Sequence, residues 1–151
     1  MKIELVTYRE LGSMYVVYPD GPRISCYENT LLTVLREDTG RECVEKLLDS
    51  TELRELIDRQ RILMLFPNPR NGVWDTKLGR KHRGEMQTVI DMVTKFNSRC
   101  EENDHSPYHN MHNARYYIGV GSGAVMAQSI AAVYPVNVAG IFTIGGRLPA
   151  G

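Results

Sequence analysis

A glycine-rich junction between an apolar strand and an Ala-rich helix constrains this chain more than any other segment. Residues 116–118 read Tyr-Tyr-Ile, residues 119–124 read Gly-Val-Gly-Ser-Gly-Ala, and residues 125–132 continue as Val-Met-Ala-Gln-Ser-Ile-Ala-Ala. Glycines gather at such a junction because the backbone takes positive φ there and the helix packs closely on the sheet. We call residues 119–124 the glycine turn. Proteins place either a nucleophile at the tip of such a turn or a phosphate against the helix N-terminus.

Composition narrows the class of protein. The chain has 151 residues, of which 42% are hydrophobic, so we expect a single domain with a buried core. Lys plus Arg and Asp plus Glu are equal at 18 each, which predicts no nucleic-acid partner. No apolar run approaches the roughly 20 residues of a membrane span, so no membrane partner is expected. The first residues lack the apolar core of a signal peptide, which favours a cytoplasmic location.

Cysteine and histidine spacing predicts no metal site and no cofactor. The widely spaced Cys26, Cys43 and Cys100 contain no Cys-x-x-Cys pair, which favours reduced thiols and leaves a single disulfide in a secreted form open. His105, His109 and His112 lie at spacings that could ligate zinc. A proline at position 107 interrupts any helix there, so we favour a solvated loop.

The order of apolar segments predicts an α/β fold. We expect strands at 2–8, 14–18, 30–35, 61–66, 116–118 and 138–144, and helices at about 41–58 (with a possible break at 49–51), 84–102 and 125–133. Alternation of strands and helices after residue 30 indicates a mostly parallel sheet with helices on both faces. Residues 1–29 would add an antiparallel meander, and residues 30–146 would form the parallel core of the same domain.

Ligands bind parallel sheets at the carboxyl ends of the strands. In this chain those ends are residues 36–40, 67–74, 119–123 and 145–147. Trp74, with Asn68 and Asn71, follows one of the strands and could form a wall that binds a sugar or an aryl group. The alternative is that Trp74 covers the edge of the sheet.

A dinucleotide site is one interpretation of the glycine turn, because Gly119, Gly121 and Ala124 match G-x-G-x-x-A. That fingerprint belongs at the first strand–helix turn of a domain and is followed by an acidic residue about 20 positions later. Here the turn comes late, and the next strand ends Thr-Ile-Gly-Gly over 143–146 without an acid. We therefore rank this interpretation below the next one.

The segments after the turn resemble the α/β-hydrolases. The helix closes with Ala-Ala-Val-Tyr-Pro over 131–135, and the next strand opens with Val-Ala-Gly-Ile over 138–141. Together with Phe-Pro-Asn-Pro at 66–69, these motifs are similar to the branch of polyhydroxybutyrate-depolymerase-like and feruloyl-esterase-like proteins. The resemblance spans about residues 30–146. It implies a partial α/β-hydrolase fold and a relationship to carboxylic ester hydrolases.

The resemblance also implies which residue should act as nucleophile. Aligning the Tyr134-Pro135 motif places Gly121 at the family's nucleophile position, with Gly119 and Gly123 as the two flanking glycines. Ser122 then falls where the family uses a backbone N–H for the oxyanion. The alternative register makes Ser122 the nucleophile, but one residue rotates a helix by about 100°, so a single hydroxyl cannot serve both. We favour the register with Gly121 at the tip.

The second oxyanion donor of the family should come from the loop after the strand at 30–35. This chain has Arg36-Glu37-Asp38 there in place of a His-Gly-Gly run. Carboxylates near a developing oxyanion oppose it, unless the Arg36 side chain compensates. A simpler interpretation is that Glu37 and Asp38 are solvated residues that cap the next helix.

In chain order the family's acid and histidine follow the nucleophile. All four histidines of this chain precede the turn, so we expect either part of a larger hydrolase-like domain or an incomplete triad. The leading hypothesis is an esterase-like protein of doubtful activity, with Ser122 as its nucleophile if it is active and with a small ester or a carbohydrate-linked ligand. A non-catalytic binding module and a nucleotide-binding domain are the alternatives. The sheet edge after Ile144 would be completed by a further segment, a second chain or an oligomer.

Overall fold

The computed structural model describes residues 1–20, 30–75, 84–102 and 115–146. The strands are β1 (Lys2–Tyr8), β2 (Gly12–Tyr18), β3 (Thr30–Leu35), β4 (Ile62–Pro67), β5 (Arg115–Val120) and β6 (Gly140–Ile144). The helices are α1 (Arg41–Leu47), α2 (Thr51–Gln60), α3 (Gly84–Glu102), α4 (Ser122–Val133) and the 3₁₀ turn η1 (Pro135–Asn137).

All six strands form one sheet in the order β1-β2-β4-β3-β5-β6. β2 pairs antiparallel with β1 and with β4, whereas the β4–β3, β3–β5 and β5–β6 pairs are parallel. The predicted α/β class, with its N-terminal antiparallel meander and mostly parallel core, is confirmed.

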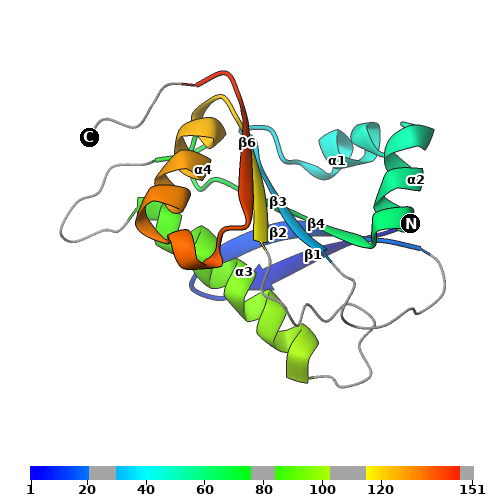
Figure 1. Cartoon of the computed structure of the whole chain (residues 1–151), viewed down its shortest axis with the longest axis horizontal. Coiled ribbons are helices and arrows are strands. Elements are labelled where there is room, and N and C mark those ends of the chain that lie inside the picture. The colour runs from blue at the N-terminus through cyan, green and yellow to red at the C-terminus, as the bar shows by residue number, and fades with distance from the viewer. Residues whose placement is uncertain (21–29, 76–83, 103–114, 147–151) are drawn as a thin grey trace.

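Helices cover both faces of the sheet, as predicted. α3 and α4 lie on one side and α1 and α2 on the other (Figure 1). The larger core joins apolar residues of α3 and α4 to one face of the strands, including Phe96, Met126, Leu63 and Tyr117. Parallel strands with both faces covered need apolar residues at consecutive positions, which explains the apolar runs at 30–35 and 62–66.

The other face carries a smaller core beneath two short helices. α1 ends at Leu47 and α2 begins at Thr51, so the helix expected over 41–58 is broken near the anticipated position. Ser50 causes the restart, because its hydroxyl accepts a hydrogen bond from the Leu53 N–H at 3.2 Å and so caps α2. α2 ends at Gln60, and its C-cap residue Arg61 takes a left-handed φ of 53° before β4 begins.

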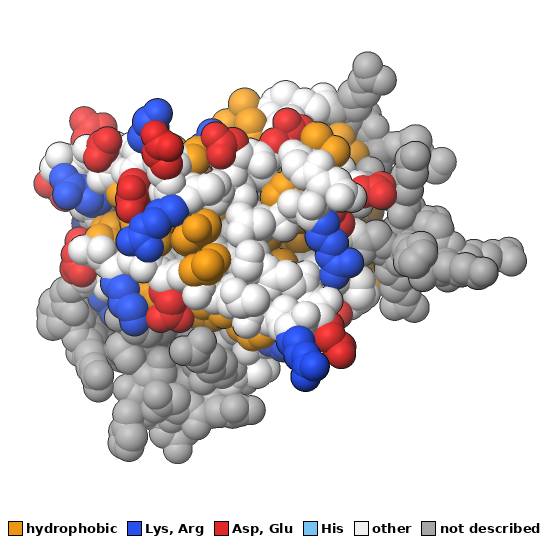
Figure 2. Space-filling view, turned by 180° about the vertical axis from the view of Figure 1, so that it is seen from behind, with side chains coloured by type: hydrophobic (Ala, Val, Ile, Leu, Met, Phe, Trp, Pro, Cys, Tyr) orange, Lys and Arg blue, Asp and Glu red, His pale blue; other side chains and the backbone are white. Residues whose placement is uncertain are grey.

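Acidic and basic side chains are interspersed on the face of the molecule that Figure 2 shows, and the sequence contains equal numbers of the two. Within the described ranges, no helix has the length and apolar character needed to cross a membrane.

We expect the free energy of unfolding to depend on pH in the alkaline range because of the buried phenol of Tyr117. Burial raises the pKa of its phenol above the usual value of 10, while the neighbouring Arg115 guanidinium opposes that rise. The unfolded chain therefore loses this proton near pH 10 while the folded chain keeps it. Because the unfolded state then binds fewer protons, we expect the free energy of unfolding to fall as pH rises above about 10.

Urea denaturation between pH 9 and 11 measures this effect. The Tyr117→Phe variant should lose part of the alkaline slope, whereas Tyr116→Phe, on the next residue and 41% exposed, should keep it. An unchanged slope in Tyr117→Phe would contradict the assignment.

Candidate functional site

The carboxyl ends of β3, β4, β5 and β6 meet at one edge of the sheet, and the glycine turn lies at that edge. Gly121 has φ 63° and ψ −124° and directly precedes α4. Its N–H donates to the Ile144 carbonyl at 3.1 Å, and its own carbonyl accepts from the Ala124 N–H at 3.0 Å. The positive φ thus reverses the chain from strand to helix within a single residue, a geometry that favours glycine.

The glycines on either side of Gly121 are required by close packing. A Cβ on Gly119 would lie 2.6 Å from the Ala124 Cα, and one on Gly123 would lie 2.5 Å from the Leu35 carbonyl carbon. Both obstacles are backbone atoms that cannot move aside. Gly119 and Gly123 therefore allow the first turn of α4 to rest directly on β5 and β3.

Gly121 differs from its neighbours because the space beside it is open. A Cβ at this position would lie 3.6 Å from the nearest atom, Oε1 of Glu37, which is an ordinary van der Waals separation. Only the positive φ disfavours a side chain here. A side chain on residue 121 would point toward the loop that follows β3.

Ser122 is the first residue of α4 and its polar groups are engaged. The hydroxyl oxygen accepts a hydrogen bond from the Trp74 backbone N–H at 3.1 Å. The Ser122 N–H donates to Glu37 Oε1 at 3.4 Å. The hydroxyl thus helps to fix the loop after β4 against the start of α4.

Glu37 does not cap the next helix, α1, as the simpler interpretation of the sequence predicted. The residue that caps α1 is Gly40, without a side-chain hydrogen bond, so the prediction that Glu37 caps the next helix is wrong. The carboxylate instead lies at the start of α4, a helix with no acidic residue in its own first turn. Negative charge is favourable at that end of a helix, which accounts for the contact.

Trp74 is only 5% exposed, so its ring packs in the larger core instead of forming an open wall for a ligand. Its indole N–H donates to the Arg36 carbonyl at 3.0 Å. The Arg36 side chain is half-buried and lines a cavity of about 570 Å³ together with residues of α1 and the preceding loop: Asp38, Gly40, Arg41, Glu42, Cys43, Lys46 and Leu47. Trp74 is therefore hydrogen-bonded to the loop after β3, and Arg36 lines the cavity beside α1.

Asn68 and Glu85 hold the loop after β4 in place. The Asn68 side chain accepts a hydrogen bond from the Thr39 hydroxyl and donates one to Ser13 Oγ at 2.9 Å. Glu85, 8% exposed, accepts from the backbone N–H groups of Arg70 at 3.1 Å and Asp75 at 3.4 Å. Sequence reasoning missed Glu85, although an acid at the start of a predicted helix is a usable signal.

Among solved structures, an acetyl xylan esterase from Aspergillus awamori is similar to this chain, with a TM-score of 0.70 and 19% sequence identity. The chain therefore shares the α/β fold of the matched part of that protein. The match covers 98% of this chain and 53% of the esterase, so the chain spans about half the length of that protein. No family model and no curated protein matches the sequence.

Some candidate residues from the sequence analysis lie outside the part of the chain that the structure describes. All four histidines (His82, His105, His109 and His112), and with them the possible zinc ligands, lie outside the described residues. Among the residues that are described, no three His, Cys, Asp or Glu side chains are grouped in a way that could hold a metal ion. The described edge thus brings together the glycine turn, Glu37, Trp74 and Asn68.

Proposed function

We propose that this protein is an esterase-like binding module that does not perform serine-dependent acyl transfer at its glycine turn. The observation that carries the proposal is the backbone of Gly121, whose positive φ at the strand–helix reversal leaves the tip of the turn without a side chain. Ser122 follows inside α4, where its hydroxyl accepts the Trp74 N–H. The ligand we expect is a small ester or a carbohydrate-linked molecule, bound at the carboxyl edge of the sheet.

Glu37 supports the proposal on electrostatic grounds. Acyl transfer requires hydrogen-bond donors directed at an oxygen that becomes negative in the transition state. The Ser122 N–H that could serve as such a donor already faces the Glu37 carboxylate at 3.4 Å. A second negative oxygen at this position would be repelled, so the arrangement disfavours hydrolysis.

The same carboxylate disfavours the nucleotide-binding alternative. A pyrophosphate would need the N-terminus of α4, where Glu37 already supplies a negative charge. We expect NAD and ATP to leave the melting temperature of the protein unchanged. A dose-dependent rise with either nucleotide would favour nucleotide binding instead.

Labelling with a fluorophosphonate probe tests the main proposal. We expect no adduct on Ser122 by peptide mass mapping, and no difference between the native protein and Ser122→Ala in hydrolysis of p-nitrophenyl acetate, because the hydroxyl is engaged and no general base contacts it among the described residues. An active serine esterase serves as the positive control. An adduct on Ser122 that disappears in Ser122→Ala would replace the proposal with a serine esterase.

A further inference from the structure

A polar cavity lies at the carboxyl edge of the sheet, between the loop after β3 and helix α1. We call it the α1 cavity, and its volume of about 570 Å³ is in the range of small-molecule sites. Arg36 and Asp38 line it from the loop. Glu42 and Lys46 line it from the helix. Because parallel sheets bind ligands beyond the carboxyl ends of their strands, this cavity has the position expected of a ligand site.

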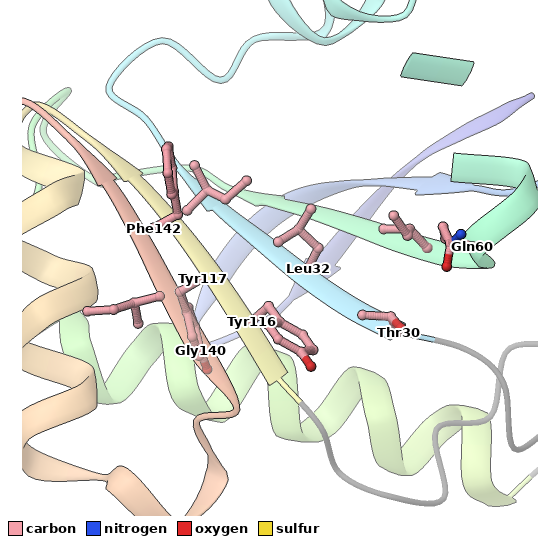
Figure 3. A pocket seen from close by; sticks show the side chains of 10 residues that line it. Thr30, Leu32, Gln60, Tyr116, Tyr117, Gly140 and Phe142 are labelled. Atoms are coloured by element: carbon pink, nitrogen blue, oxygen red, sulfur yellow. The ribbon is translucent and has the colours of Figure 1, made fainter. Parts of the chain in front are cut away.

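Another cavity of similar size differs in both position and chemistry. It has a volume of about 530 Å³ and lies toward the amino ends of the strands, where Thr30 begins β3 and Gly140 begins β6 (Figure 3). Leu32, Tyr116 and Phe142 contribute apolar surface there, and none of the residues that line it is charged. Of these two cavities, the α1 cavity is therefore the one that can recognise a charged ligand.

Arg36 supplies an unengaged cation to the α1 cavity. Its side chain is half-buried, and its guanidinium has neither an ion pair nor a hydrogen bond within the described ranges. The backbone of the same residue is fixed, because its carbonyl accepts the Trp74 indole N–H at 3.0 Å. A guanidinium on a fixed backbone is well suited to hold a carboxylate through two parallel hydrogen bonds.

The other two cations of the α1 cavity differ from each other. Arg41 already donates to the Glu45 carboxylate at 2.8 Å. Lys46, in the last turn of α1, forms no ion pair with any residue that the structure describes. Lys46 is exposed, so its charge contributes less to binding than that of the half-buried Arg36.

Asp38 and Glu42 set a second requirement for the ligand. An ionised carboxylate only accepts hydrogen bonds, so a ligand beside these residues must donate them, as the hydroxyl groups of a sugar do. The two acids also repel additional negative charge. A phosphate monoester, with a charge of about −1.5 to −2, therefore fits this cavity less well than a singly charged carboxylate.

We propose that the α1 cavity binds a uronate, the carboxylate-bearing sugar unit of a carbohydrate-linked ligand. The Arg36 guanidinium holds the carboxylate, and Lys46 adds a second positive charge. Asp38 and Glu42 accept hydrogen bonds from the ring hydroxyls. This inference rests on the proposed function, since it names the class of ligand that binds at the carboxyl edge.

NMR titration of the protein with methyl β-D-glucuronide and with methyl β-D-glucoside tests the proposal. The two probes differ at one carbon, which is a carboxylate in the first and a hydroxymethyl group in the second. We expect the glucuronide to bind at least about tenfold more tightly and to shift the amide signals of residues 36–47, because a charge-assisted bidentate pair is stronger than neutral hydrogen bonds. Absence of glucuronide binding, equal affinities, or tighter binding of glucose 6-phosphate would overturn the proposal.

The Arg36→Gln variant tests the assigned residue. The substitution removes the positive charge and keeps the backbone carbonyl that accepts from Trp74, so we expect a native circular dichroism spectrum. The dissociation constant of the glucuronide should rise at least about tenfold, and that of the glucoside should change little. Arg59→Gln makes the same change of charge on an exposed residue of α2 outside the cavity, and it should leave both constants unchanged. An undiminished preference for the glucuronide in Arg36→Gln would contradict the assignment.

The uronate site and the proposed function fail in different experiments. A fluorophosphonate adduct on Ser122 would replace the binding module with a serine esterase, without altering the measured preference for the glucuronide. Equal binding of the two sugars at the carboxyl edge would overturn the uronate site and leave the proposed binding module standing.

Discussion

The Gly123→Ala variant is expected to lose its fold, or to lose more than about 4 kcal/mol of its free energy of unfolding. The added Cβ would overlap the backbone carbonyl of Leu35, and neither atom can move without moving the backbone of α4 or of β3. Relief would require α4 to move away from β3, which would open the larger core around Met126 and Ile130. Urea denaturation followed by circular dichroism measures the loss.

Gly121→Ala is the matched control for that variant. Its Cβ meets only the Glu37 carboxylate, at 3.6 Å, so the cost is confined to the positive φ. A non-glycine residue held at φ 63° and ψ −124°, a sparsely populated region of backbone space, costs about 1–3 kcal/mol. If Gly121→Ala proved as damaging as Gly123→Ala, then the argument from backbone contact would be wrong.

The second large effect is expected for Trp74→Ala, which should lower the free energy of unfolding by about 3–5 kcal/mol. The substitution removes a ring that is 5% exposed, together with the indole N–H that holds the Arg36 carbonyl. The loop after β3 would lose one of its attachments to the loop after β4, while the hydrogen bond from Thr39 to Asn68 remains. Hydrogen exchange at the Ser122 amide should then accelerate, because Glu37 on the loosened loop is held less firmly beside it.

Trp74→Phe separates packing from hydrogen bonding. Phenylalanine keeps most of the apolar contact but cannot donate to the Arg36 carbonyl, so we expect a smaller loss of stability than in Trp74→Ala together with faster exchange at Ser122. If both variants retained the native stability, Trp74 would have no role in joining the two loops.

Much of the fold could be predicted because it follows from local patterns. The strand Thr30–Leu35 and the helix Gly84–Glu102 have the predicted bounds. The strand is a continuous apolar run, the helix has apolar residues at helical spacing, and polar residues follow both. Strand pairing also followed from the sequence in part, since alternating strands and helices produce parallel neighbours.

The contacts at the carboxyl edge could not be predicted in the same way. Glu37 and Ser122 are 85 positions apart, and no local pattern says which of two helices an acid in a polar loop will cap. Trp74 posed a similar problem, because a lone tryptophan in a loop can bind a ligand or fill a core. The choice depends on where the Arg36 carbonyl and the Ser122 hydroxyl lie after folding.

Trp74 is the only tryptophan in the chain, and it contacts both the loop after β3 and the first residue of α4. Trp74 is therefore an intrinsic fluorophore at the edge of the sheet where we propose that a ligand binds. Any molecule that displaces Glu37 or shifts the start of α4 changes the surroundings of a single indole. Candidate ligands can thus be screened on unlabelled protein by the intensity and wavelength of its emission.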